Sequence, residues 1–257
     1  VARFGNYASP EYGTIKSSEN YERRFIMTFP NETLPKGRKQ KTTSLYDRFI
    51  ESGAVMGDSF GLEHVLWFAN SKRNAHEDPT FKRSRAHEYV AKEVKAVRNG
   101  VGCSEVANFA KHLITGKGAR NFLDYILAGT IPQKGRISLS PMLSHKGKLV
   151  GDLTVACINE EKFILFGSGT LQESHRRWFE NFLPQEGVQY KNCSDELHGI
   201  AISGPKSREL LSRICREDVS GDSLKFLDIR ETFVAGVSSL LNRISFTGEL
   251  GYEIYTA

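Results

Sequence analysis

Long apolar runs are missing from this sequence of 257 residues. No stretch approaches the roughly 18 uninterrupted apolar residues that a membrane-spanning helix needs, so we expect no membrane association. Hydrophobic residues make up 39% and charged residues 25% of the chain, which are ordinary values for a globular protein. The length can bury a sizeable core, in one large domain or in a small domain attached to a larger one.

Cysteine is sparse, and its spacing argues against two classes of small domain. The four cysteines are Cys103, Cys157, Cys193 and Cys215, with no C-x-x-C pair among them. Common zinc sites and dense disulfide frameworks need closer or more numerous cysteines. The seven histidines show no H-x-x-x-H or H-E-x-x-H spacing, so we expect no metal site. The cysteine pattern favours a reducing compartment, either a bacterial cytoplasm or a mitochondrial matrix.

An initiator methionine and a charged-then-apolar leader are also missing, because the sequence starts at Val1 in mid-pattern. A secretory signal has a charged segment followed by an apolar one. We therefore expect a piece of a longer protein, without a secretory signal.

The net charge of +5 at pH 7 raises the question of nucleic-acid binding. The basic clusters are Lys36, Arg38, Lys39 and Lys41, then Lys82, Arg83 and Arg85. They lie among turn formers without the interleaved aromatic residues of a single-strand platform, and charge runs usually mark a solvated face. We predict no nucleic-acid partner; attraction of a small polyanion is a milder use.

Residues 1–83 are rich in turn formers and polar residues, which indicates a smaller unit or a linker region. One short helix is predicted over residues 44–52. There Leu45, Phe49 and Ile50 form an apolar stripe behind a serine cap.

A regular pattern begins at residue 84. Val90, Val94 and Val97 recur at helical spacing, and Asn99 with Gly100 ends the predicted helix.

Two later segments resemble each other: LITGKGARNFLD, residues 113–124, and AISGPKSRELLS, residues 201–212. Each is typical of a short apolar strand, a glycine (Gly116 or Gly204), and a helix with an arginine and a leucine at matching offsets. The pattern predicts an internal repeat.

A further strand and turn follow each repeat unit, over residues 135–158 and 240–256. Helices interspersed with strand pairs indicate an α+β fold with antiparallel sheets. A helix is predicted over residues 171–183 between the halves, with Trp178 and Phe182 on one face as core residues.

Gly167, Ser168 and Gly169 follow a predicted strand, as a phosphate loop would. The Walker lysine and the third glycine of a dinucleotide fingerprint are both missing. We interpret the glycines as a strand end that passes close to a ligand or a helix.

Asp152 is the residue that the pattern singles out. It lies in the apolar stretch 149–158, which is typical of a strand covered on both faces. The two-residue period places it on one face with Val150, Thr154 and Ala156. An unpaired charge there costs free energy, so Asp152 must meet a partner, solvent or a ligand. An aspartate satisfied by neighbouring backbone explains the pattern about equally well.

The second turn offers a possible counterpart. Aligning Gly248 with Gly147 places Glu253 opposite Asp152, with Glu249 inside the turn. Two such carboxylates would suit a ligand with an N–H edge, because a carboxylate accepts two parallel hydrogen bonds. The alternative is a solvated hairpin tip.

The segments TGELGYEIY, SPMLSHKGKLVGDLTVA and ISGPKSRELL resemble the aminomethyltransferase (glycine-cleavage T-protein) family. The resemblance is strongest to the version in the C-terminal half of dimethylglycine and sarcosine dehydrogenases. It implies a C-terminally incomplete folate-binding domain over residues 84–257, of α+β class with antiparallel sheets and an internal pseudo-repeat. Residues 44–68 resemble the connecting domain of those flavoenzymes, so residues 1–83 are expected to be part of it.

In that family a flavin domain oxidises an N-methyl group to an iminium, and tetrahydrofolate captures the one-carbon unit as 5,10-methylenetetrahydrofolate. The resemblance therefore implies tetrahydrofolate as the cofactor here, with FAD in the parent protein outside this chain. The implied partners are the missing flavin domain and a small N-methylated amine.

The resemblance also implies roles for single residues. Asp152 matches the catalytic aspartate, and Glu249 matches the glutamate that holds the N–H edge of the pterin. The other implied folate-binding positions are Leu113 and Thr154 in the pocket wall, Gly167 in place of a folate-contacting asparagine, and Leu250 and Gly251. Two departures, Gly151 for the first aspartate of a pair and Glu105 for the aspartate of a D-x-S motif, favour folate binding over T-protein activity itself.

Two other functions remain open. A non-catalytic regulatory module would resemble the regulatory subunit of pyruvate dehydrogenase phosphatase, which is similar to these dehydrogenases. A folate-dependent demethylase or aminomethyltransferase of another substrate would use the same domain. Asp152 and Glu249 favour an enzyme over the regulatory module.

Overall fold

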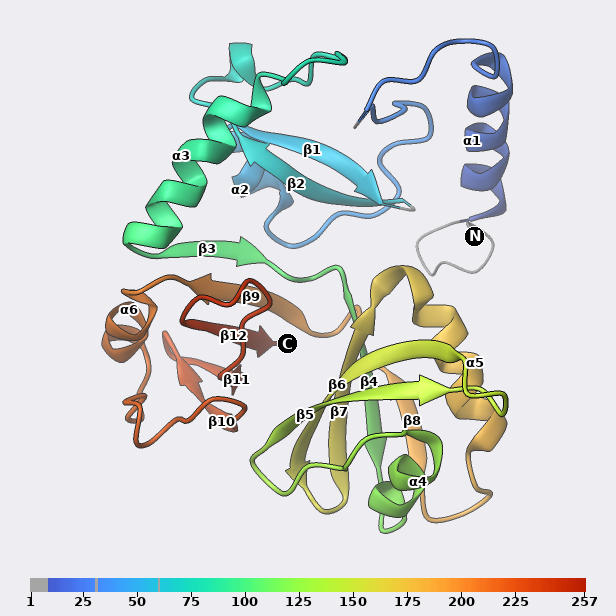
Figure 1. Ribbon diagram of the computed structural model, residues 1–257, viewed down its shortest axis with the longest axis vertical. Helices are drawn as coiled ribbons and strands as arrows, with labels where there is room; N and C mark the ends of the chain where they lie inside the picture. Colours follow the sequence, from blue (N-terminus) through green and yellow to red (C-terminus); the bar gives the residue numbers. More distant parts are fainter. Residues whose placement is uncertain (1–8, 31, 60) are drawn as a thin grey trace. The chain divides into compact units, whose positions relative to one another are not determined.

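The computed structural model describes residues 9–30, 32–59 and 61–257, and Figure 1 shows its elements. Contacts divide the chain into two compact units, Val1–Ala96 and Val97–Ala257. The division falls inside helix α3 (Ala86–Asn99). The domain boundary predicted after residue 83 stays a prediction.

The first unit contains a two-stranded antiparallel sheet and short helices. Its elements are α1 (Pro10–Glu22), α2 (Tyr46–Glu51), β1 (Ala54–Ser59), β2 (Leu62–Phe68) and the 3₁₀ helix η2 (Lys72–Asn74). Ser9 caps α1 by accepting a hydrogen bond from the Tyr12 amide at 3.0 Å. Trp67 lies in the core of this unit, where it stacks on Tyr89 with ring centroids 4.9 Å apart.

Helix α2 confirms the predicted helix over residues 44–52, but two details of the prediction were wrong. The N-cap residue is Leu45, and no side chain caps the helix. A two-stranded sheet offers little surface, so the helix buries Tyr46 and contacts Phe68 through Phe49, while Ile50 remains 37% exposed. The predicted apolar stripe is therefore only partly covered.

Helix α3 confirms the helix predicted to begin near residue 84 and to end at Asn99. Its valines are less buried than the spacing suggested: Val90 and Val94 are 36% and 49% exposed.

The second unit contains two five-stranded antiparallel sheets, with the orders β5-β6-β7-β4-β8 and β10-β11-β12-β9-β3. The strands are β3 (Gly102–Glu105), β4 (Phe109–Thr115), β5 (Ile137–Leu143), β6 (Leu149–Asn159), β7 (Lys162–Ser168), β8 (Gln189–Asn192), β9 (His198–Ser203), β10 (Ile229–Val234), β11 (Val237–Asn242) and β12 (Gly251–Thr256). The helices are α4 (Ala119–Ile126), α5 (Gln172–Phe182) after the 3₁₀ turn η3 (Gly169–Leu171), and α6 (Ser207–Ile214). The predicted α+β class with antiparallel sheets is confirmed.

The internal repeat is also confirmed, since β4 and α4 repeat as β9 and α6. The glycines between strand and helix, Gly116 and Gly204, have φ of 113° and 119°, a backbone conformation that glycine adopts readily. The Gly116 amide donates to the Glu161 carbonyl at 2.9 Å, and the Gly204 amide donates to the Leu250 carbonyl at 2.8 Å. The two turns are thus built alike.

The two halves exchange one strand each. Strand β3 precedes β4 in sequence but pairs with β9, and β8 precedes β9 but pairs with β4. Each sheet is therefore completed by a strand from the other half, which ties the two repeats into one unit.

The strand order shows that the predicted alignment of Gly147 with Gly248 was wrong. Gly147 lies in the turn between β5 and β6, whereas Gly248 lies between β11 and β12, whose counterparts are β6 and β7. Ile137 and Ile229, the first residues of β5 and β10, pair with Ala156 and Asn242. Four residues earlier on the partner strands, Ser238 is therefore the equivalent of Asp152.

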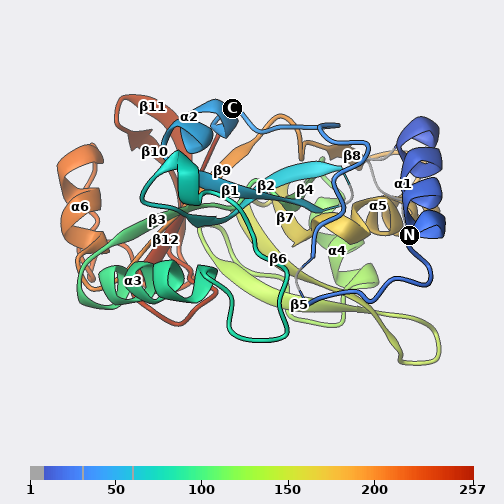
Figure 2. The same cartoon turned by 90° about the horizontal axis from the view of Figure 1, so that it is seen from above.

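Three clusters of buried residues form the core of this unit. One lies between the first sheet and helices α4 and α5, and a second packs the other sheet against α6. Figure 2 shows α5 beside the first sheet and α6 beside the second. The third lies between the sheets, where Phe166 and Tyr255 stack with centroids 4.4 Å apart. Trp178 and Phe182 pack against the first cluster, as predicted.

Within the described residues, none of the helices combines the length and apolar character needed to span a membrane.

Candidate functional site

Asp152 is an exposed residue in the middle of β6, between the buried residues Gly151 and Leu153. Its face of the strand continues through the half-buried Thr154 to the buried Ala156, as the two-residue period predicted. Coverage on both faces begins only beyond Asp152, so that part of the prediction was wrong at this position. In the part of the chain that the structure describes, the carboxylate forms no hydrogen bond or ion pair, and it faces solvent.

The cross-strand neighbours of Asp152 and Thr154 are apolar. Pro141 of β5 lies opposite Asp152, and Leu139 lies opposite Thr154. Leu139 is 70% exposed. An exposed leucine beside a solvated carboxylate gives this face both an apolar and an anionic character, which suits a flat ligand that has a polar edge.

Leu113 lies on the same side of the first sheet. It belongs to β4 and packs against the cluster between the sheets. Phe166, in that same cluster, pairs with Thr154 across β6 and β7. The structure therefore brings Leu113, Asp152 and Thr154 to one face of one sheet.

Gly167 faces the opposite side. A Cβ atom at this position would lie 2.7 Å from Cδ2 of Leu153 and 3.1 Å from ring atoms of His175 on α5. The strand end therefore passes close to a helix, which is one of the two alternatives that its sequence left open. The resemblance implies a folate-contacting asparagine at this position in the family. Here a side chain at position 167 would point away from the face of Asp152.

Glu249, Leu250 and Gly251 lie together where the chain enters β12, in the second sheet. A hydrogen bond from the Thr247 side chain is the main cause that lowers the pKa of Glu249, with a smaller effect from Arg98. Oε1 of Glu249 is 4.0 Å from a terminal nitrogen of Arg98. Oε2 is buried and has no hydrogen-bond partner within the described residues, so this oxygen would gain a hydrogen bond from a donor that reaches it.

The backbone beside Glu249 has a structural role. The Leu250 carbonyl accepts hydrogen bonds from the Gly204 amide and the Ser207 hydroxyl. The Gly251 carbonyl accepts one from Arg243 at 3.0 Å. These bonds hold the chain that presents Glu249.

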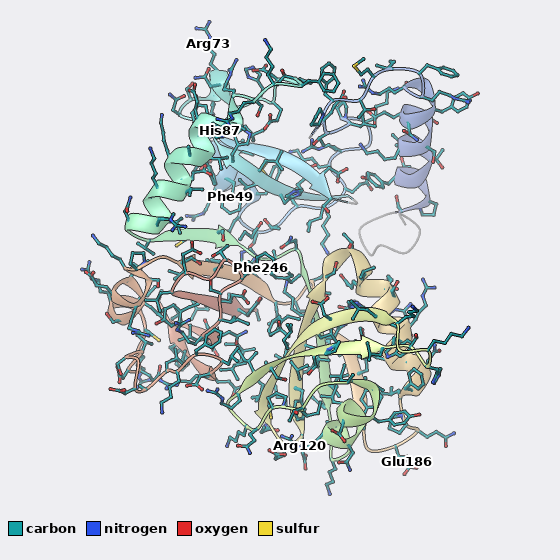
Figure 3. The ribbon with its side chains drawn as sticks, viewed as in Figure 1. Phe49, Arg73, His87, Arg120, Glu186 and Phe246 are labelled. Carbon is teal, nitrogen blue, oxygen red and sulfur yellow. The ribbon has the colours of Figure 1, made fainter. Side chains whose placement is uncertain are left out.

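The same loop carries Phe246, which is 91% exposed and labelled in Figure 3. An exposed phenylalanine three residues before Glu249 adds apolar surface next to the carboxylate.

No hydrogen bond or ion pair among the described residues joins Asp152 to Glu249. Asp152 belongs to the first sheet, whereas Glu249 lies in the loop that leads into β12 of the second sheet. Glu253 does not lie opposite Asp152, because β12 pairs with β9 and β11. The Tyr255 hydroxyl donates to Glu253 at 2.8 Å, and burial raises the pKa of Glu253. Glu253 is thus a residue of the second sheet and not the partner of Asp152.

Sequence reasoning missed a buried polar cluster behind Asp152. His112 of β4 and Gln172 of α5 are fully buried, and His175 of α5 is 1% exposed. Burial lowers the pKa of His112 to about 3 and also lowers the pKa of His175, which nearby Asp152 raises in part. Polar residues three apart on the apolar side of a predicted helix are the signal that could have found Gln172 and His175.

Among the described residues, no group of three or more histidine, cysteine, aspartate or glutamate side chains could hold a metal ion.

Comparison with known proteins places these features in a wider context. Residues 45–257 match the family model described as the GCVT N-terminal domain. Mitochondrial dimethylglycine dehydrogenase of Homo sapiens is 34% identical over 98% of this chain and 29% of the relative. The 4-methylaminobutanoate oxidase (formaldehyde-forming) of Paenarthrobacter nicotinovorans is 28% identical over 99% of this chain and 31% of the relative.

One solved structure supports the fold. The crystal structure of glycine cleavage system aminomethyltransferase T from Bartonella henselae matches 84% of this chain and 53% of that chain, with a TM-score of 0.69 at 21% identity. This match confirms the predicted aminomethyltransferase fold. The chain spans less than a third of the length of the two sequence relatives.

Proposed function

Because the chain belongs to the family of the GCVT N-terminal domain, we propose that it is the tetrahydrofolate-binding part of an FAD-dependent N-methyl amine oxidoreductase. Its substrate would be of the dimethylglycine or sarcosine type, in line with the 34% identical dimethylglycine dehydrogenase. Residues 84–257 would be the folate-binding domain, C-terminally incomplete, and residues 1–83 part of a connecting domain. The oxidising flavin domain would belong to the polypeptide outside this chain, in a mitochondrial matrix or a bacterial cytoplasm.

The observation that carries the proposal is the exposed Asp152 carboxylate, which has no partner within the described residues and shares its face with Leu113 and Thr154. A solvated carboxylate can accept hydrogen bonds from a ligand without first breaking an internal ion pair. The buried Oε2 of Glu249 has no hydrogen-bond partner within the described residues, and the N–H edge of a pterin would supply one if it reached this oxygen.

Bound tetrahydrofolate would supply the nucleophilic nitrogens that form bonds to the iminium carbon. Asp152 would orient the attacking N–H, stabilise the cationic iminium and accept the proton released as the new C–N bond forms. The bond between the carbon and the substrate nitrogen would then break, and that nitrogen would take up this proton and leave as the demethylated amine. The proton of the second N–H would pass to solvent as the second C–N bond forms. Leu113 and Thr154 would line the wall of the folate pocket and hold the reacting atoms together. The association entropy would then be lost when the ligands bind and not in the reaction step.

The test is product trapping with the complete enzyme that carries this chain. We expect Asp152→Asn to lower the yield of 5,10-methylenetetrahydrofolate and to raise free formaldehyde, while the rate of amine oxidation stays constant. Asp124→Asn, an exposed carboxylate on α4, is the matched control. An unchanged methylenetetrahydrofolate yield in Asp152→Asn would sink the proposed role of this residue.

A second candidate is an oxidase that releases its one-carbon unit as formaldehyde. The 28% identical relative from Paenarthrobacter nicotinovorans, a formaldehyde-forming oxidase, favours it. In that case the wild-type enzyme yields formaldehyde with or without added tetrahydrofolate. The regulatory alternative predicts neither amine oxidation nor binding of reduced folate.

A further inference from the structure

The strand that carries Asp152 is paired on one side only at that residue. The ladder between β6 and β7 ends at the pair Thr154 and Phe166. On the other side, Asp152 lies opposite Pro141. Proline has no N–H to donate, and the Pro141 carbonyl already accepts from the Ala128 amide at 2.9 Å. The backbone beside Asp152 is therefore paired with β5 alone, through the neighbouring residues Gly151 and Leu153.

His175 of α5 occupies the region where β6 and β7 separate. A Cβ atom on Gly151 would lie 2.6 Å from Nε2 of His175, and a Cβ atom on Gly167 would lie 3.1 Å from Nδ1. Real Cβ atoms essentially never show the first distance. Only because both strands have glycine at these positions can the imidazole pack directly against both backbones.

We infer that His175 is a positioning residue for Asp152: its ring, wedged between Gly151 and Gly167, sets the spacing of β6 and β7 where their ladder stops. The residue is 1% exposed, so the wedge is fixed within the core. Gly151 and Asp152 are adjacent on β6, so a shift of the first changes the direction in which the second presents its carboxylate. The functional part of this inference rests on the proposed role of Asp152.

The surroundings of His175 are polar as well as tight. Neither ring nitrogen has a hydrogen-bond partner within the described residues, and the same holds for the buried amide of Gln172 one turn earlier. His112 lies 5.8 Å away, ring centroid to centroid. The charged group that acts on His175 is Asp152, whose negative charge raises the histidine pKa, while burial lowers it more strongly. The wedge and the carboxylate therefore interact electrostatically as well as through the backbone.

The first experiment follows the ring nitrogens of His175 by NMR in the wild type, Asp152→Asn and Asp124→Asn. Removing the charge of Asp152 should lower the pKa of His175, whereas Asp124→Asn should leave it where it is. An unchanged His175 pKa in Asp152→Asn would overturn the inference. This experiment needs no folate, so it decides the coupling even if the proposed function fails.

The second experiment is a double-mutant cycle on affinity for tetrahydrofolate. His175→Ala should bind tetrahydrofolate about tenfold more weakly, because the Asp152 carboxylate is then misplaced. In the Asp152→Asn background the same change should have no further effect, because His175 acts through Asp152. An equal loss in both backgrounds would overturn the inference.

Two further variants separate positioning from stability. Phe179→Leu removes volume from the same core next to His112 without touching Gly151 or Gly167, so affinity should stay at the wild-type level although the protein is less stable.

If His175→Ala does not fold, Gly151→Ala tests the same wedge by pushing against the ring, and it should also weaken binding. Normal binding by Gly151→Ala would contradict the inference. Failure of the wild type itself to bind tetrahydrofolate would count against the proposed function and leave the NMR result to decide.

Discussion

Phe166 and Tyr255 stack with an interplanar angle of 28°, and this pair joins the two sheets of the second unit. Phe166 comes from β7 and Tyr255 from β12, which are equivalent strands of the internal repeat. Each half of the repeat thus supplies one aromatic ring to the core between the sheets.

Truncation of this contact should destabilise the second unit. Phe166 is 5% exposed, and we expect Phe166→Ala to lower the free energy of unfolding by about 3–5 kcal/mol, from lost burial and a residual cavity. Phe233→Ala, at a residue that is 44% exposed, should cost far less. Urea unfolding monitored by circular dichroism measures both; equal losses would show that the stacked pair is not a core contact.

The glycines of the repeat should both resist substitution. A Cβ atom at Gly116 would collide with the Gly187 carbonyl, and one at Gly204 would collide with the carbonyls of Val97 and Gly100. We expect Gly116→Ala and Gly204→Ala each to cost about 1–3 kcal/mol or more, because positive φ adds to the clash.

Gly147 is the control for that comparison. It also has a positive φ, of 68°, but nothing lies within 4 Å of its Cβ position. Gly147→Ala should therefore show only the smaller cost of the backbone conformation. Thermal unfolding of the three variants gives the ranking, and a Gly147 variant as unstable as the other two would contradict it.

His112 should make stability depend on pH. Burial lowers its pKa from 6.5 to about 3, so the unfolded chain binds a proton at a higher pH than the folded protein does. The stabilisation is therefore complete above pH 6.5 and is lost as the pH falls from 6.5 towards about 3. At pH 4 the loss would be about 3 kcal/mol.

The measurement is the free energy of unfolding at pH 7 and pH 4. His112→Gln should lose less stability between the two values than the wild type does. The exposed His145 provides the control, since His145→Gln should keep the wild-type difference. If His112→Gln also keeps it, the buried imidazole is not the source of the pH dependence.

Local patterns predicted much of this fold. Gly116 and Gly204, with similar residues around them, revealed the repeat because a strand, a glycine turn and a helix are all encoded within about 12 residues. The resemblance of the motifs to the aminomethyltransferase family is confirmed by the family match over residues 45–257. The placement of Asp152 on a strand face with Thr154 was also correct.

The sequence did not reveal which strands distant in the chain pair with each other. The alignment of Glu253 with Asp152 failed because a strand and a turn do not indicate which strands become neighbours. The wedge at His175 depends on Gly151 and Gly167, which meet only after β6, β7 and α5 have packed together. Ile50 stayed exposed because helical spacing does not reveal how much surface is available to cover it.

The central claim is that Asp152 binds reduced folate, and titration calorimetry with tetrahydrofolate under anaerobic conditions tests it most directly. The wild type and Asp124→Asn should bind alike, and Asp152→Asn should bind at least about tenfold more weakly, the loss expected for a charge-assisted hydrogen bond. Equal affinity of all three proteins, or no binding by the wild type, would contradict the account.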